Sequence, residues 1–221
     1  MKLHGILFDL DGTLIDSLAD LAAATNQALW ELGLPQHPLL PFRQFVGNGA
    51  RKLIERALPE THREDAVIDT ALERMRATYA AGWANATAPY PGIPELLDSL
   101  RDDHADLRIG VLSNKPDPFT QKMVAHFFPD MPFDPIRGAF PDVPLKPDPA
   151  VAEHITAAWG CAASEILYVG DGAPDIRFAK NAGMPSLGVA WGFRGRDELE
   201  REQADIVIDS VREFLPALGL A

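Results

Sequence analysis

Apolar positions follow two different patterns along this chain. Residues Gly5 to Phe8 form a short unbroken apolar run, which is typical of a strand that is buried on both faces. After Ser17, a plausible N-cap residue, apolar side chains recur only at helical spacing as far as about Ala88. This spacing predicts helices over 18–32, 49–58 and 63–84, and Pro89-Tyr90-Pro91-Gly92 then breaks the pattern.

Short apolar runs alternate with helical segments over the remainder of the chain. We expect strands over 108–112, 166–170, 186–190 and 206–208, and helices over 95–100, 119–127, 150–159 and 176–182. Alternation without hairpin signals predicts a parallel sheet with helices on both faces. The predicted fold class is α/β, a doubly wound, Rossmann-like core of residues 1–15 and 90–221 with an inserted all-helical domain over 16–89. The proline-rich stretches 129–135 and 141–149 are expected to be ordered loops.

Composition and charge narrow the class of partner. The 221 residues are 47% hydrophobic and 24% charged, as in a soluble globular protein, and the net charge is -12. This charge argues against nonspecific binding to nucleic acid or to anionic membranes, so an anionic substrate needs a local cation. The single cysteine, Cys161, is interpreted as structural. With no signal-peptide pattern and no apolar stretch near the roughly 20 residues that span a bilayer, we expect a cytoplasmic protein.

The first apolar run ends in two carboxylates, in the segment Asp9-Leu10-Asp11-Gly12. Carboxylates at the end of a buried strand must be paired, protonated or bound to a cation, which suggests chemistry at this point. Asp-Gly is also a common turn pair, so this segment alone is compatible with a plain strand and turn.

Polar residues also follow later strands, and in a parallel sheet ligands gather at the carboxyl ends of the strands. The polar residues concerned are Ser113-Asn114-Lys115, Lys146, Asp171 and Asp175. Four carboxylates close together repel one another, and Lys146 offsets only one of the charges. A divalent cation with oxygen ligands would relieve the rest, and Mg²⁺ suits such a site, whereas no His-Cys cluster suggests zinc.

At these residues the chain resembles the haloacid dehalogenase superfamily of phosphohydrolases. Four motifs match in order: Asp9-x-Asp11-Gly12-Thr13, Ser113, Lys146, and Gly170-Asp171-x3-Asp175. The resemblance covers the whole chain, and the helical insert resembles the family's mobile cap. Gly172 departs from the common pattern, because many relatives have Ser or Thr there.

The resemblance implies a role for each motif. Asp9 would be the nucleophile that forms an aspartyl-phosphate, and Asp11 the general acid-base, with its backbone carbonyl on the metal. Asp171 would bind Mg²⁺, with Asp175 as a ligand or its supporting partner, and Lys146 would neutralise charge. Phosphate contacts are expected from Thr13, Ser113 and Asn114, the last through its backbone N–H.

The substrate is expected to be decided in the insert. Gly47-Asn48-Gly49 precedes a helix that carries Arg51, so Asn48 and Arg51 could bind an anion such as a carboxylate, although a turn followed by a solvated arginine fits as well. The segment resembles the cap of phosphoglycolate phosphatases. Matches at Pro91-Gly92 and Trp191-Gly192-Phe193 are interpreted as structural. Lys115 is either a second anion contact or a solvated loop lysine.

The resemblance therefore implies an Mg²⁺-dependent phosphatase, a monomer or homodimer, that acts on 2-phosphoglycolate or a similar small phosphorylated metabolite. Three alternatives stay open. A phosphomutase like β-phosphoglucomutase would retain Asp11. An enzyme like phosphonoacetaldehyde hydrolase needs a lysine in the cap, and Lys52 is the one present in the insert. A non-catalytic module that binds phosphate ligands is the third. A dehalogenase would lack Asp11.

Overall fold

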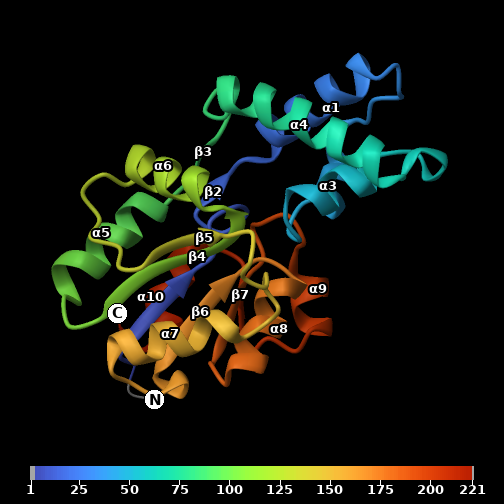
Figure 1. Ribbon diagram of the computed structural model, residues 1–221. Coiled ribbons are helices and arrows are strands. Elements are labelled where there is room, and N and C mark those ends of the chain that lie inside the picture. Colours follow the sequence, from blue (N-terminus) through green and yellow to red (C-terminus); the bar gives the residue numbers. More distant parts are fainter. Residues whose placement is uncertain (1–2, 221) are drawn as a thin grey trace. The chain divides into compact units, whose positions relative to one another are not determined.

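A computed structural model describes residues 3–220 (Figure 1). The chain divides into two compact units, one of Met1–Ile15 with Pro89–Ala221 and the other of Asp16–Ala88. We call them the core unit and the cap unit. The second boundary falls one residue before the predicted one.

The core unit is built on a six-stranded sheet in the order β5-β4-β1-β6-β7-β8, in which all neighbouring strands are parallel. The strands are β1 (Gly5–Phe8), β4 (Arg108–Pro116), β5 (Ile136–Ala139), β6 (Ile166–Gly170), β7 (Ser186–Val189) and β8 (Ile206–Ile208). In register, Gly5 lies opposite Arg108 on one side and Ile166 on the other. The predicted doubly wound α/β class is confirmed.

Two strands differ from the sequence-based expectation. The edge strand β5 was not predicted, because it is short, is only partly buried and lies between two proline-rich stretches. Strand β4, between β5 and β1, continues through Ser113, Asn114 and Lys115 instead of ending at Leu112, and its pairing with β5 is irregular there. Polar residues that are buried at the end of a strand break the apolar run by which a strand is recognised.

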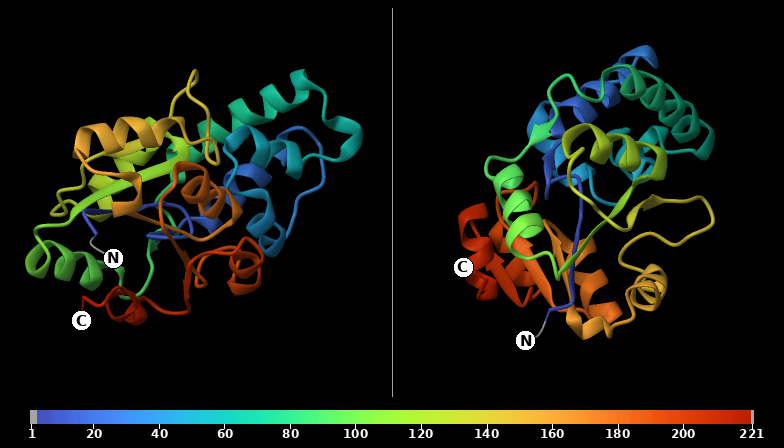
Figure 2. Two further views of the ribbon diagram at one scale, coloured as in Figure 1. Left: turned by 90° about the horizontal axis from the view of Figure 1, so that it is seen from below. Right: turned by 90° about the vertical axis from the view of Figure 1, so that its left-hand side faces the viewer.

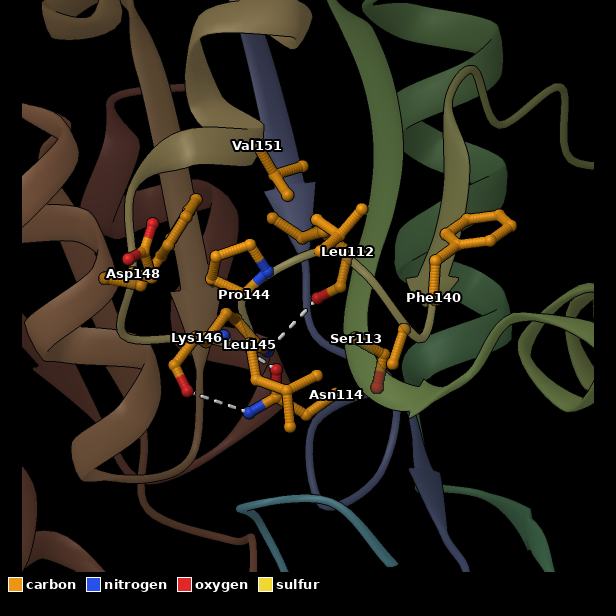
Figure 3. Close-up of a pocket in the computed structure, with 13 residues that line it drawn as sticks. Leu112, Ser113, Asn114, Phe140, Pro144, Leu145, Lys146, Asp148 and Val151 are labelled. Atoms are coloured by element: carbon orange, nitrogen blue, oxygen red, sulfur yellow. Dashed lines mark hydrogen bonds between the residues drawn. The ribbon is translucent and has the colours of Figure 1, made fainter.

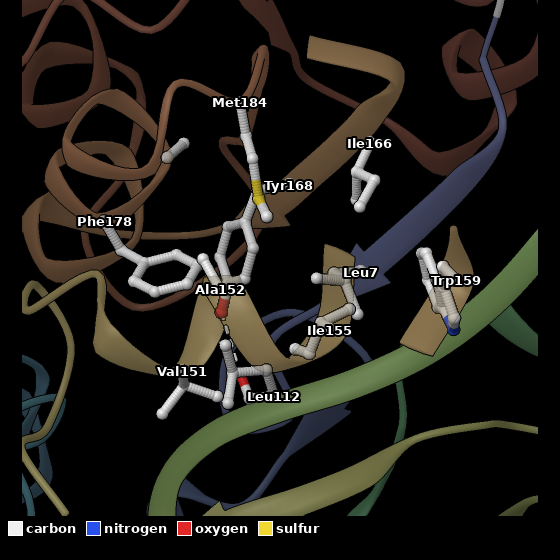
Figure 4. Packing of buried hydrophobic residues seen from close by; sticks show 11 residues of the cluster. Leu7, Leu112, Val151, Ala152, Ile155, Trp159, Ile166, Tyr168, Phe178 and Met184 are labelled. Atoms are coloured by element: carbon white, nitrogen blue, oxygen red, sulfur yellow. Dashed lines mark hydrogen bonds between the residues drawn. The ribbon is translucent and has the colours of Figure 1, made fainter. Parts of the chain in front are cut away.

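Helices cover both faces of the sheet. On one face, α7 (Ala150–Trp159) and α8 (Ala173–Ala182) pack on inward side chains of β1, β4 and β6 (Figure 4). On the other face, Phe214 of α10 (Phe214–Leu218) stacks on Phe8 with ring centroids 5.7 Å apart. The right-hand view of Figure 2 shows α7 and α10 on opposite sides of the sheet. Adjacent residues of β1 therefore face opposite layers, as the pleat requires.

The other core helices are α5 (Ile93–Asp103), α6 (Asp117–Phe127) and α9 (Arg196–Arg201), with short 3₁₀ turns at η2 (Ala163–Glu165) and η3 (Val211–Glu213). Helix α8 begins three residues before the predicted start, so that Asp175 lies in its first turn. The first turn of a helix favours a carboxylate, because the N-terminal N–H groups lack partners within the helix.

The cap unit is helical, as predicted. It contains α1 (Leu18–Glu31), α2 (Leu39–Phe45), α3 (Ala50–Ala57), η1 (Glu60–His62) and α4 (Asp65–Gly82), of which α2 was not predicted separately. The two-residue strands β2 (Ile15–Asp16) and β3 (Ala88–Pro89), which pair with each other, contain both points where the chain passes between the units. Among residues 3–220, no helix is long and apolar enough to span a membrane.

Candidate active site

The central strand β1 delivers Asp9 to the carboxyl edge of the sheet. The Asp9 N–H donates to the Val169 carbonyl at 2.9 Å, and a tight turn follows at once, in which Leu10 O accepts N–H groups of residues 13, 14 and 15 at 3.3, 3.0 and 3.1 Å. Gly12 has φ +88, and a Cβ there would collide with the carboxylate of Asp171. Glycine is therefore required both by the turn and by the close approach of the first and fourth motifs.

Three buried carboxylates meet at this edge. Oxygen atoms of Asp9, Asp171 and Asp175 lie within 4.8 Å of one another. Burial raises the pKa of Asp9 to about 6, with the charge of Lys146 opposing the rise and that of Asp175 adding to it. Burial, with the charges of Asp175 and Asp9, likewise raises the pKa of Asp171 well above its usual range. The cluster is therefore costly to ionise unless a cation joins it.

Lys146 is the buried cation beside these carboxylates. Its Nζ lies 2.9 Å from Asp9 Oδ1 and donates at 2.7 Å to Asp175 Oδ1, at 2.7 Å to the Tyr168 hydroxyl and at 3.1 Å to Leu112 O. Burial alone lowers the pKa of Lys146, but the charges of Asp175 and Asp9 outweigh it and raise the pKa well above its usual value. Lys146 therefore offsets charge on both Asp9 and Asp175.

The carboxylate cluster fits a hard divalent cation. Asp9 Oδ1 is buried without a hydrogen-bond partner, whereas both Asp175 oxygens accept hydrogen bonds, from Lys146 and from the Gly172 N–H at 3.2 Å. Asp171 Oδ2 accepts the Phe193 N–H at 2.6 Å. An all-oxygen donor set with excess negative charge suits a hard divalent cation better than zinc.

Asp11 has a different partner from Asp9. Both oxygens of its carboxylate lie 3.1 Å from Nζ of Lys115, a residue of β4, and both side chains are largely buried. The backbone N–H of Lys115 donates to Ser113 Oγ at 3.3 Å. The structure thus brings the predicted acid and two predicted anion-binding residues together.

Asn114 fixes the backbone at Lys146. Its Nδ2 donates to Lys146 O at 3.0 Å, and its Oδ1 accepts the Lys146 N–H at 2.8 Å (Figure 3). The pocket beside this pair has a volume of about 10 Å³, which is room for about one water molecule. The side chain of Asn114 therefore positions the third motif, and the contact of its backbone N–H with phosphate stays a prediction.

Several residues that contact the candidate site were missed, or interpreted as structural, in the sequence. Tyr168 is fully buried, and its hydroxyl donates to Leu112 O at 2.8 Å while accepting from Lys146. The loop after β7, interpreted above as merely structural, touches the site: Trp191 Nε1 donates to Thr13 O at 3.1 Å, and a Cβ on Gly192 would collide with Asp171. A tyrosine inside an otherwise apolar strand was the available signal, because a buried hydroxyl needs partners.

The two predicted substrate residues of the cap unit both have partners within that unit. Arg51 pairs with Asp65 at 2.5 Å and with Asp69, and all three side chains are exposed. Asn48 Oδ1 accepts a hydrogen bond from Arg56 Nη2 at 2.7 Å. Their role as substrate contacts stays a prediction.

Comparison with known proteins identifies the family. Residues 6–189 match the family model of the haloacid dehalogenase-like hydrolases. The chain belongs to this family.

Within the family, the relatives include phosphoglycolate phosphatases. That of Pseudomonas putida is 35% identical over 214 residues, covering 96% of this chain and 78% of the relative. That of Shigella boydii is 31% identical over 237 residues, covering 99% and 93%. A crystal structure of a predicted phosphoglycolate phosphatase from Haemophilus somnus matches this chain with a TM-score of 0.87 at 27% sequence identity. A crystal structure of a protein from Lactobacillus delbrueckii subsp. bulgaricus, provisionally designated a phosphoglycolate phosphatase, matches with a TM-score of 0.90 at 26% identity. Each match covers 99% of both chains. The resemblance inferred from the motifs is confirmed.

Proposed function

We propose that this protein is a cytoplasmic, Mg²⁺-dependent phosphomonoester hydrolase that acts through an aspartyl-phosphate, with 2-phosphoglycolate as its substrate. The observation that carries the proposal is the position of Asp9, which ends the central strand beside Lys146 and two further buried carboxylates. The curated relatives named phosphoglycolate phosphatase support the choice of substrate.

Asp9 is the nucleophile. Its carboxylate attacks phosphorus while Lys146, which stays protonated, offsets the negative charge that builds up between the nucleophile and the phosphoryl oxygens. Lys146 Nζ lies 2.9 Å from Asp9 Oδ1, so the positive charge is next to the attacking carboxylate. Mg²⁺, when bound by Asp9, Asp171 and the main-chain carbonyl of Asp11, supplies further neutralisation of charge.

Asp11 is the acid-base group, and the second motif binds the phosphoryl group. Asp11 protonates the leaving oxygen and then takes a proton from the water that hydrolyses the aspartyl-phosphate. Ser113 Oγ and the Asn114 N–H bind phosphoryl oxygens. Thr13 Oγ1, which is buried without a hydrogen-bond partner, is a further donor for them.

A panel of phosphate esters tests the proposal. With Mg²⁺, phosphate release is measured from 2-phosphoglycolate, hexose phosphates, nucleotides and pyrophosphate, and isomerisation is measured with a hexose 1-phosphate. We expect release with the highest kcat/KM for 2-phosphoglycolate. Isomerisation without phosphate release would instead indicate a phosphomutase, and ligand binding without any turnover would indicate a binding module.

A further inference from the structure

We propose that Lys115 selects substrates with a second anionic group beside the phosphate, and that this group displaces the carboxylate of Asp11 from Lys115. The inference rests on the proposed function and deepens it, because it assigns the selection to a residue of the core unit and couples it to the release of the acid.

The contact between Lys115 and Asp11 is buried and symmetric. Nζ lies 3.1 Å from each carboxylate oxygen, and the side chains are 4% and 12% exposed. Removing a carboxylate from contact with a buried ammonium group is unfavourable unless another anion takes its place. A neutral substituent cannot replace Asp11 there, whereas a carboxylate can, because it offers the same charge and the same two acceptor oxygens.

Lys115 is next to the predicted phosphate site, and its backbone is fixed. Its N–H donates to Ser113 Oγ at 3.3 Å, and Thr120 Oγ1 donates to Lys115 O at 3.2 Å. On β5, a Cβ at Gly138 would lie 2.6 Å from Lys115 O, so the neighbouring strand packs directly on this backbone. The flexible side chain of Lys115 is therefore the part that can change partners.

Lys146 cannot take this role. Its three ammonium hydrogens are used by Leu112, Tyr168 and Asp175, all buried with it. Lys115 instead holds a group that must move for catalysis. In the proposed mechanism Asp11 presents an oxygen to the leaving group, and the symmetric contact with Lys115 opposes that movement.

The exchange links recognition to turnover. The second anionic group of a substrate takes the place of Asp11 on Lys115 and thereby frees Asp11. An analogue without that group binds through its phosphate and leaves Asp11 on Lys115. The preference is then expressed in kcat as well as in KM, as expected when binding energy assembles the catalytic group.

Two substrates of equal length test the inference: 2-phosphoglycolate and 2-hydroxyethyl phosphate, in which a hydroxymethyl group replaces the carboxylate. We expect Lys115→Met to lower kcat/KM for 2-phosphoglycolate roughly 10- to 100-fold, the loss of one hydrogen-bonded charge contact. The same variant raises kcat for 2-hydroxyethyl phosphate, because Asp11 is released without an anion. Lys115→Arg retains the preference in part, and Lys122→Met, a control at an exposed position of α6, leaves the ratio unchanged.

An equal loss on both substrates in Lys115→Met would contradict the inference, since Lys115 would then act on the shared phosphoryl group or on the fold. A wild-type experiment decides the question if that variant does not fold. Acetate and methyl phosphate together carry the groups of 2-phosphoglycolate, so acetate is expected to raise kcat for methyl phosphate. No effect, or inhibition alone, would overturn the inference. Failure of the wild type on every ester would instead refute the proposed function.

Discussion

The two units use the same charged residue types in opposite ways. In the core unit, the pair of Lys146 and Asp9 has side chains 3% and 12% exposed, whereas in the cap unit the pair of Arg51 and Asp65 has side chains 46% and 89% exposed. Exposed pairs contribute about 0–1 kcal/mol to stability, but buried charges must be compensated by a partner. These pairs of the two units therefore differ in whether their charges are buried or solvated.

The cap unit also has a buried carboxylate, and its surroundings are instructive. Asp20 accepts hydrogen bonds from the N–H groups of Ala86 and Thr87 and from the Thr87 hydroxyl, at 2.7 to 3.1 Å. Asp9 Oδ1, by contrast, is buried beside Lys146 Nζ at 2.9 Å and accepts no hydrogen bond of good geometry. A buried carboxylate whose hydrogen bonds are satisfied holds a fold together, whereas one left unsatisfied is prepared to bind a cation or to react.

Matched Asp→Asn substitutions give the largest expected contrast between the units. Asp171→Asn removes a proposed cation ligand, so we expect the Mg²⁺ concentration for half-maximal activity to rise by about 10- to 100-fold. Asp20→Asn is expected to lower the melting temperature and leave the Mg²⁺ requirement unchanged. Titration of phosphate release with Mg²⁺ measures both, and an unaltered metal response in Asp171→Asn would remove it as a ligand.

The stability of the metal-free protein is expected to fall as the pH rises. Asp9 has a pKa of about 6 in the folded protein and near 3.8 when unfolded, so its proton stabilises the fold fully below pH 3.8 and this contribution is lost as the pH passes 6. The loss is on the order of 3 kcal/mol, and Asp171 acts in the same direction.

Urea unfolding in a chelator, at pH 4 and pH 7, isolates the Asp9 contribution by comparing wild type with Asp9→Asn. Relative to the wild type, the free energy of unfolding of Asp9→Asn is expected to be higher at pH 7 than at pH 4, because the substitution removes the buried charge. A constant difference between the two proteins across this range would show that Asp9 is not destabilised by burial.

Tyr168→Phe tests the support beneath Lys146. Loss of the hydroxyl leaves Lys146 and Leu112 each without one hydrogen bond, so we expect kcat to fall roughly 10-fold with little change in KM. Tyr79→Phe, at a buried tyrosine of the cap unit, serves as the matched control and is expected to retain kcat. Equal effects of the two variants on kcat would assign Tyr168 a purely structural role.

The smallest effect is expected from Arg51→Ala. Arg51 is exposed and already pairs with Asp65 and Asp69, so its removal is expected to change the unfolding free energy by less than about 1 kcal/mol. The ratio of 2-phosphoglycolate to p-nitrophenyl phosphate turnover should change by less than about threefold, within the scatter of such effects. A larger fall in this ratio would indicate that Arg51 binds the carboxylate of 2-phosphoglycolate, one of the two interpretations of Arg51 from the sequence.

Elements with an unmixed pattern could be predicted closely. Strands β1 and β6 and helix α7 have the predicted bounds, because apolar runs and helical spacing are uninterrupted there. Strand β5 and the end of β4 could not be found this way, since partial burial and buried polar residues blur the pattern.

The candidate site shows the same division. Its residues could be selected because each follows a strand, but their partners depend on tertiary packing. Lys115 and Asp11 are 104 residues apart in the chain. No local pattern indicates that Lys115 contacts the carboxylate of Asp11 rather than an anionic group of the substrate. Tyr168 reads as an ordinary core residue until its contact with Lys146 is seen.

The central claim is that Asp9 becomes phosphorylated during turnover. Wild-type enzyme mixed with excess 2-phosphoglycolate and Mg²⁺ is acid-quenched, reduced with borohydride and digested, and the peptides are analysed by mass spectrometry. Reduction converts an aspartyl-phosphate to homoserine, so the account predicts homoserine at position 9 in the wild type and none at Asp11, Asp171 or Asp175. Rapid turnover with no homoserine at position 9, or with phosphate found on Ser113, would contradict it.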